Sequence, residues 1–133
     1  MKIKRQEKVL IYNFNEVSDE EKACDFFQSL HIKTIVLSPD AFCQKVGFLL
    51  GITGFSRVEK TNNANFYFCQ KVIVFYNIKN KRLDEVLQKM RQANINIAYK
   101  AVVTPLNRFW SLQRLCLSMQ KEHGFFLDKK RNE

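Results

Sequence analysis

The chain has 133 residues, of which 46% are hydrophobic and 13% are aromatic, so it can bury the core of one domain and is not a disordered protein. Its four glycines and two prolines exclude collagen-like and low-complexity sequence. The net charge of +9 favours an anionic partner over a cationic one. The longest apolar stretch, residues 46–52, is far shorter than the roughly 20 residues of a membrane-spanning helix, so no membrane span is expected.

The cysteines and the first residues predict a cytoplasmic protein. Cys24, Cys43, Cys69 and Cys116 lie far apart and form no metal-binding pair, which is typical of small buried residues in a reducing compartment. The basic residues 1–5 are not followed by the uninterrupted apolar core and small-residue cleavage site of a signal peptide. We therefore expect no metal site and a cytoplasmic location.

The first half of the chain predicts two strands and two helices. Residues 9–14 form an apolar run typical of a strand covered on both faces. A capping box at residues 18–21 then predicts the start of a helix, and its apolar residues 23, 26, 27 and 30 share one face. Residues 34–37 predict a second strand. Ser38 and Pro39 open a second helix, which we expect to end at Gly51.

The second half repeats this order. Residues 72–76 predict a buried strand, and the helix after it carries an apolar stripe with the same spacing as the first. A strand at residues 101–103 leads to Thr104 and Pro105, which open a helix expected to end near Gly124. These parallels predict one domain, 1–133, with internal repeats at about 8–51 and 71–124 joined by loop 52–70.

Alternation of strands and helices predicts an α/β fold with a four-stranded, mainly parallel sheet of order 2-1-3-4 and helices on both faces. A ferredoxin-like α+β sandwich of order 4-1-3-2, with the helix at residues 40–50 as an insertion, is the alternative. Both place the two most apolar strands in the centre. In the first arrangement a ligand is expected over the carboxyl ends of the central strands, at residues 13–16 and 77–80.

The sequence contains no recognisable catalytic or cofactor motif. Neither strand-to-helix turn holds the glycine pattern of a dinucleotide or nucleotide-triphosphate site. His31 and His123 fall near the ends of predicted helices, where an imidazolium complements the helix dipole. We predict no catalytic, cofactor-binding or metal-binding residues, which favours a protein without enzymatic activity.

Residues 100–123 are the most distinctive part of the chain. Thr104 is placed at a helix N-cap, and Asn107 is spaced so that its side chain can return to that cap. The simplest interpretation is a capped helix that Trp110 locks onto the sheet. The functional interpretation is an anion or partner site at the start of this helix. Its candidate residues are Lys79, Lys100, Thr104, Asn107, Arg108 and Trp110.

This segment resembles a bacterial family of small uncharacterised domains, the domain of unknown function 3783 family. The family pattern is a buried strand, a threonine-asparagine-tryptophan motif and a helix that ends in Glu-His. The matching residues are Ala101, Val102, Thr104, Asn107, Trp110, Glu122 and His123. The resemblance covers roughly residues 71–123. It implies a bacterial, intracellular α/β domain and brings no established activity with it.

Three functions therefore remain open. The first is a non-enzymatic interaction or regulatory module that binds an unknown protein partner, or itself as a homodimer, through residues 66–68 or the last helix. The second is a nucleic-acid-binding domain, because residues 79–121 hold nine basic and two acidic residues. Its phosphate contacts are expected at Lys79, Lys81, Arg82, Lys89, Arg91 and Arg108. The third is a domain for a small phosphorylated ligand at the strand ends.

Overall fold

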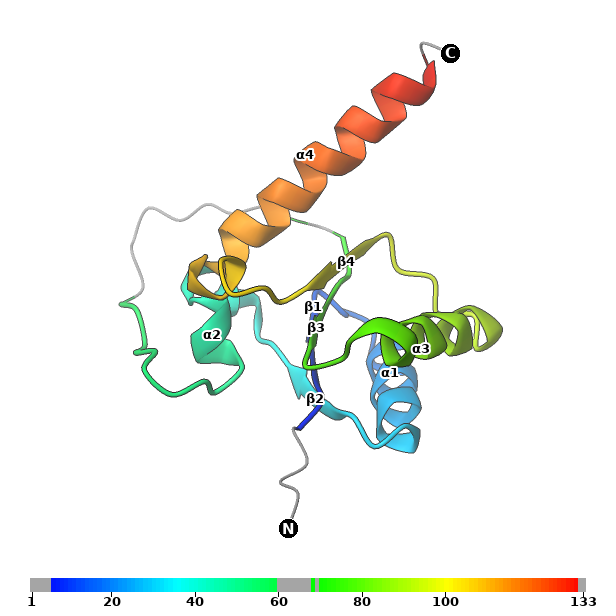
Figure 1. Ribbon diagram of the computed structural model, residues 1–133, viewed down its shortest axis with the longest axis horizontal. Coiled ribbons are helices and arrows are strands. Elements are labelled where there is room, and N and C mark those ends of the chain that lie inside the picture. Colours follow the sequence, from blue (N-terminus) through cyan, green and yellow to red (C-terminus); the bar gives the residue numbers. More distant parts are fainter. Residues whose placement is uncertain (1–5, 60–67, 69, 132–133) are drawn as a thin grey trace.

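The computed structural model describes residues 6–59, 68 and 70–131 (Figure 1). The elements follow in the order β1 (Lys8–Tyr12), α1 (Val17–Ser29), β2 (Lys33–Val36), the 3₁₀ helix η1 (Pro39–Cys43), α2 (Val46–Leu49), β3 (Val72–Tyr76), α3 (Asn80–Gln92), β4 (Tyr99–Val102), the 3₁₀ helix η2 (Asn107–Phe109) and α4 (Leu112–Arg131). The four strands form one sheet of order β2-β1-β3-β4. This confirms the predicted α/β fold and strand order and excludes the ferredoxin-like alternative.

The two central strands run in opposite directions. β1 pairs with β2 and β3 pairs with β4 in parallel, whereas β1 and β3 are antiparallel, with Leu10 opposite Val74. The sheet is therefore mainly parallel. The expected shared ligand site at residues 13–16 and 77–80 is wrong, because antiparallel neighbours place their carboxyl ends at opposite edges of the sheet.

The antiparallel centre decides which helices share a face. α1 and α3 both pack on one face, where Phe27 and Val86 join the same buried cluster with Ile11 and Ile73 of the central strands. The chain crosses from β1 to β2 on one side of the sheet centre and from β3 to β4 on the other. Because β1 and β3 are antiparallel, right-handed crossovers in these two directions place α1 and α3 on the same face. η1, α2 and α4 cover the other face, where Leu50 and Leu112 are buried (Figure 1).

Both helices on the second face are interrupted, which corrects the prediction of continuous helices from residues 39 and 105. Gln44 and Trp110 have extended backbones with ψ near 150°. The amide of Val46 donates to the Trp110 carbonyl, and the amide of Leu112 donates to the Gln44 carbonyl, both at 2.9 Å. Each interrupted helix thus satisfies its free backbone groups through the other.

Two other helix ends differ from the expected ones, and a third confirms the expectation. α1 begins at Val17 with Glu16 as N-cap, so Ser18 lies inside the helix and does not cap it. His31 follows α1 with a positive φ of 61°, which confirms its place at a helix end. α4 continues past Gly124 to Arg131 and projects from the rest of the fold (Figure 1). No helix in the described residues has the length and apolar character needed to span a membrane.

The two halves hold each other through equivalent asparagines. Asn13 follows β1 and Asn77 follows β3, both with positive φ, which asparagine tolerates better than most residues. Asn13 Nδ2 donates to the carbonyl of Gln70, just before β3, at 3.1 Å. Asn77 Nδ2 donates to the carbonyl of Gln6, just before β1, at 3.2 Å. These matched contacts support a duplication of residues 8–51 and 71–124, which stays a proposal.

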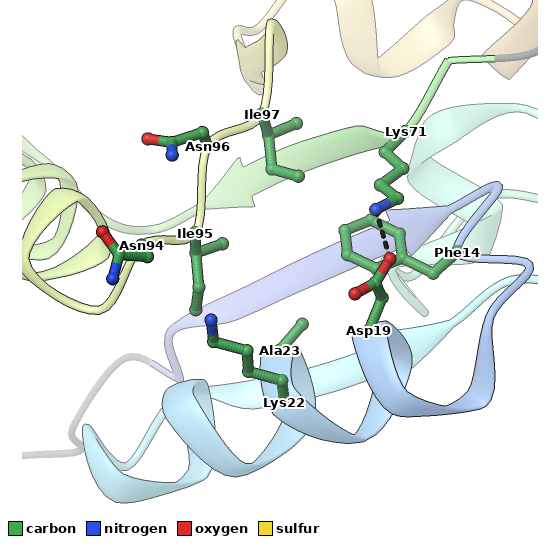
Figure 2. Close-up of a pocket in the computed structure, with 9 residues that line it drawn as sticks. All are labelled: Phe14, Asp19, Lys22, Ala23, Lys71, Asn94, Ile95, Asn96 and Ile97. Atoms are coloured by element: carbon green, nitrogen blue, oxygen red, sulfur yellow. Dashed lines mark hydrogen bonds and ion pairs between the residues drawn. The ribbon is translucent and has the colours of Figure 1, made fainter.

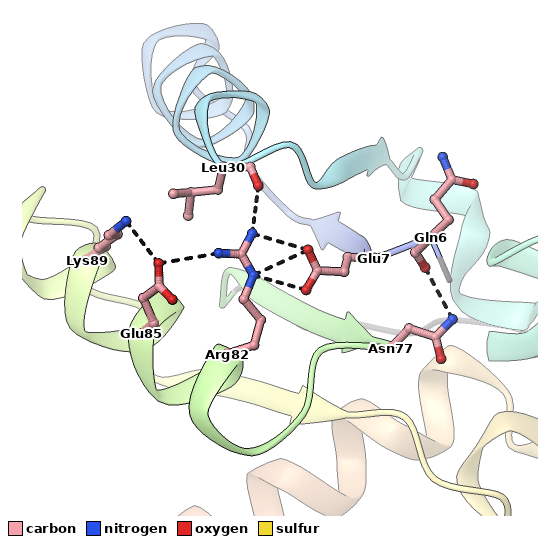
Figure 3. A network of polar contacts seen from close by, with 7 residues as sticks. All are labelled: Gln6, Glu7, Leu30, Asn77, Arg82, Glu85 and Lys89. Carbon is pink, nitrogen blue, oxygen red and sulfur yellow. Dashed lines mark hydrogen bonds and ion pairs between the residues drawn. The ribbon is translucent and has the colours of Figure 1, made fainter. Parts of the chain in front are cut away.

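Two ion pairs also occupy equivalent places, with their charges exchanged. Lys71 precedes β3 and binds Asp19 of α1 (Figure 2). Glu7 precedes β1 and accepts hydrogen bonds from Arg82 of α3, the shortest at 3.0 Å (Figure 3). Arg82 also donates to the Leu30 carbonyl at the end of α1, at 2.7 Å. The hydrogen bonds with Glu7 raise the pKa of Arg82 above its usual value.

Exchanging the charges of the second pair tests this equivalence. Arg82→Glu is expected to destabilise the fold by about 2 kcal/mol, because it removes charge-assisted hydrogen bonds and places two carboxylates together. Adding Glu7→Lys restores an ion pair of the Lys71–Asp19 type and is expected to recover about half of that loss. Urea unfolding of the four proteins of the cycle measures the coupling. If Arg82→Glu and the double variant are equally stable, the proposed equivalence of the two ion pairs is contradicted.

Candidate functional site

The parallel pair β3 and β4 brings three of the six candidate residues to one pocket. The segments after both strands reach the same edge of the sheet, since carboxyl ends of parallel neighbours lie together. Lys79, Thr104 and Arg108 line a cavity of about 250 Å³ there. Its other lining residues are Tyr76, Asn77, Ile78, Val102, Val103 and Pro105. The lining therefore holds two cations and no carboxylate.

Arg108 is the unusual group of this pocket. Its Nε is buried and finds no hydrogen-bond acceptor among the described residues. A buried donor without an acceptor costs about 1–3 kcal/mol, so such groups usually mark a place where a ligand or water binds. Neither Arg108 nor Lys79 has an anionic partner in the described part of the chain. The pocket carries positive charge that the described residues do not neutralise.

Thr104 and Asn107 fix the loop that forms one wall. The Thr104 amide donates to Asn107 Oδ1 at 2.7 Å, and the Asn107 amide donates to Thr104 Oγ1 at 3.0 Å. Asn107 Nδ2 donates to the Val102 carbonyl at 3.0 Å. The predicted return of the Asn107 side chain to Thr104 is thus confirmed, but the predicted N-cap position of Thr104 is wrong, because η2 begins at Asn107 with Leu106 as its N-cap. Asn107 is buried and positions the loop, while the hydroxyl hydrogen of Thr104 remains available to a ligand.

The other two candidates lie elsewhere. Lys100 is on the edge strand β4, and its Nζ donates to the Ile97 carbonyl at 2.7 Å. Trp110 packs against the core of the second face, as expected of a locking residue. The Cζ of Arg114 lies 4.3 Å from the centroid of the Trp110 ring. Lys100 and Trp110 do not line the pocket.

Sequence reasoning missed a surface that begins at the pocket. The Cζ of Arg108 lies 5.0 Å from the ring centroid of Phe109, which is 54% exposed. With Trp110 and Arg114, these residues form what we call the cation–aromatic strip. The spacing of Trp110 and Arg114, four residues apart in the sequence, was the available signal.

A groove on α4 continues this strip. It has a volume of about 410 Å³ and is lined by Ser111, Gln113, Arg114, Leu117, Ser118 and Lys121. Arg114 thus belongs to both the strip and the groove. The groove also contains no carboxylate, and its one apolar side chain, Leu117, is exposed.

A second hollow lies at the other end of β3 (Figure 2). It has a volume of about 280 Å³ and an apolar floor that includes Phe14 and Ile95. Its Lys71 is paired with Asp19 and lies 5.7 Å from the ring centroid of Phe14. Because a carboxylate already compensates this lysine, the hollow is a weaker anion site than the pocket at β3 and β4.

Cys116 and Tyr12, whose pKa values are strongly shifted, do not line the pocket. Burial raises the pKa of the Cys116 thiol to about 12, so it stays protonated near neutral pH. Burial likewise raises the pKa of Tyr12 to about 12, and its hydroxyl donates to the Pro39 carbonyl at 3.0 Å. His31 does not line the pocket, and the side chain of His123 lies outside the described part of the chain.

The basic residues proposed for nucleic-acid contact divide into three groups. Arg82 is bound to Glu7, and Lys89 is bound to Glu85, whose pKa is lowered by its hydrogen bond to Lys89. Lys79 and Arg108 line the pocket instead. Lys81 and Arg91 are exposed on α3, so the available positive charge of this set lies both near the pocket and along α3.

Comparison with known proteins concerns the same half of the chain. Residues 71–126 match the family model described as Domain of unknown function (DUF3783). None of the curated proteins and none of the solved structures gives a match. The matched segment includes β3, α3, β4, η2 and the first part of α4, and so contains every residue that lines the pocket. The second half of this chain, which builds the candidate site, is therefore similar to the DUF3783 family.

Proposed function

We propose that this protein is a non-catalytic binding module whose pocket between β3 and β4 binds a small phosphorylated ligand in the cytoplasm. The observation that carries the proposal is that Arg108, whose buried Nε has no acceptor among the described residues, lines a pocket that also holds Lys79 and no carboxylate. Arginine and lysine together suit an anion with several oxygens.

Charge and size favour a phosphate monoester. A phosphate monoester carries a charge of about −1.5 to −2 at pH 7, which balances the two cations, and Thr104 supplies a hydroxyl donor. α3 begins directly after Lys79 and has no acidic residue in its first turn, so its positive end adds to the field. The volume of about 250 Å³ fits a phosphate with a small substituent and is too small for a dinucleotide.

The protein-interaction hypothesis from the sequence stays a prediction. Phe66 and Tyr67 lie outside the described residues, and Phe68 is buried with its ring centroid 5.3 Å from that of Tyr99. Phe68 is therefore placed for packing rather than for contact with a partner.

Thermal unfolding with phosphorylated and unphosphorylated probes tests the pocket. Ribose 5-phosphate at 100 times its Kd is expected to raise the Tm by roughly 10 °C, since saturation of this degree adds about 2.7 kcal/mol. Ribose alone is expected to have no effect. Lys79→Gln and Arg108→Gln are each expected to weaken binding at least tenfold, because each removes one charge-assisted contact.

Arg91→Gln is the matched control. Arg91 lies on α3, is exposed and does not line the pocket, so this variant removes the same charge and is expected to keep the shift. An equal loss in all three variants would indicate a nonspecific charge effect. That result, or no shift with either ribose 5-phosphate or inorganic phosphate, would refute the proposed site.

A further inference from the structure

Two cation–aromatic pairs lie between the pocket and the groove on α4 in the sequence. Arg108 lines the pocket and lies over Phe109. Trp110 follows directly and is covered by Arg114, which lines the α4 groove as far as Lys121. Arg108 thus links the pocket to the strip and Arg114 links the strip to the groove, an arrangement that an extended ligand can follow.

The groove has the charge and spacing that suit a linear polyanion. Arg114 and Lys121 are two turns apart on one face of α4, a separation of about 10 Å at 1.5 Å per residue. Between them lie Ser118 and the exposed Leu117, with no carboxylate in the lining. Positive charge spaced along a shallow groove attracts a chain of phosphates.

The aromatic side chains distinguish a nucleic acid from other polyanions. Phe109 exposes more than half of its surface, although a phenylalanine contributes nothing to charge recognition. Exposed rings beside arginines are the usual platform for unpaired bases, whose faces are hidden in a duplex. A strip of this kind therefore favours a single strand over a double helix.

We infer that the pocket binds the terminal phosphate monoester of a single-stranded nucleic acid, whose bases stack at the cation–aromatic strip and whose backbone follows the α4 groove. This inference rests on the proposed phosphate site and names its ligand class. Lys79 and Arg108 hold one phosphate, Phe109 contacts a neighbouring base, and Arg114 and Lys121 contact later phosphates. RNA and DNA share this chemistry, and the ribose 2′-hydroxyl is the group that separates them.

Fluorescence anisotropy tests this inference at 50 and 200 mM salt, with a 12-nucleotide RNA that carries a 5′-phosphate and a 3′ label, the DNA of the same sequence and its duplex. We expect a single strand to bind at least tenfold more tightly than the duplex. Phe109→Ala is expected to weaken binding about tenfold, and Phe109→Tyr to retain it, because stacking needs only the ring. Arg114→Gln is expected to reduce the salt slope by about 0.7, and Arg91→Gln, which removes a charge outside the strip and groove, to leave it unchanged.

The outcomes separate the two proposals. Ribose 5-phosphate binding without oligonucleotide binding at 50 mM salt overturns the nucleic-acid inference and leaves the phosphate site intact. The nucleic-acid inference is also overturned if Phe109→Ala or Lys79→Gln leaves the affinity for the oligonucleotide unchanged, or if the duplex binds with equal affinity. Light scattering that shows a dimer disrupted by Phe109→Ala and Arg114→Gln assigns the strip to a second copy of the chain and also overturns it. Absence of binding by every probe removes both proposals.

Discussion

Phe27→Ala is expected to lower the free energy of unfolding by about 3–5 kcal/mol, which is the typical cost of removing a phenylalanine ring from a close-packed core. The Phe27 side chain of α1 is fully buried. Its ring meets Phe26 edge-on at 5.1 Å between centroids and Phe75 of β3 at 6.5 Å. The substitution therefore leaves a cavity between α1 and the centre of the sheet. Urea unfolding measures the loss.

Phe109→Ala is the matched control, since it removes the same ring from an exposed position. Its ring contacts Phe55 at 5.2 Å between centroids but remains 54% exposed, so a loss below about 1 kcal/mol is expected. If Phe27→Ala lowers the free energy of unfolding no more than Phe109→Ala does, the face with α1 and α3 does not form the main core. A small loss at Phe109 also ensures that this variant is folded in the binding experiments.

Apolar sequence runs were sufficient to predict the strands and the central place of β1 and β3, and the alternation of strands and helices predicted their order. β1 and β3 are buried on both faces, as continuous hydrophobic residues indicate, and they occupy the centre of the sheet. Their relative direction could not be predicted in this way, because side-chain alternation does not depend on strand direction. The antiparallel direction brings Asn13 to Gln70 and Asn77 to Gln6, contacts between residues far apart in the sequence.

The interrupted helices had no local signal. Residues 39–50 and 105–119 carry apolar side chains at helical spacing, which predicts continuous helices. The interruptions at Lys45 and Ser111 exist because these two residues form a bridge with each other across the second face. Tertiary hydrogen bonding thus outweighs local periodicity at both places.

The candidate site was predicted in part for a similar reason. Lys79, Thr104 and Arg108 stood out as basic or polar residues beside predicted strand ends, and the parallel pairing of β3 and β4 brings them together. Lys100 is also a basic residue at a predicted strand, but its Nζ donates to the nearby Ile97 carbonyl. The sequence does not reveal this side-chain conformation. The groove on α4 was missed because its lining residues are ordinary surface residues. They come together only where the helix places them on one face.

Asn107→Ala is expected to destabilise the protein by about 2–4 kcal/mol and to weaken phosphate binding as well. The change removes two side-chain hydrogen bonds and leaves the Thr104 amide and the Val102 carbonyl without their partners. Val102 and Thr104 both line the pocket, so their backbone is expected to move when Asn107 is lost. Urea unfolding and titration of ribose 5-phosphate measure the two effects separately.

Asn96→Ala provides the comparison, because Asn96 is exposed and outside this pocket, and a change within about 0.5 kcal/mol is expected. Asn107→Asp keeps an acceptor for the Thr104 amide but loses the donor to Val102, so its stability is expected to lie between the wild type and Asn107→Ala. If Asn107→Ala unfolds at the wild-type urea concentration, the loop after β4 is held by other contacts. If it is destabilised and still binds ribose 5-phosphate with wild-type affinity, the wall formed by Val102 and Thr104 does not shape the ligand site.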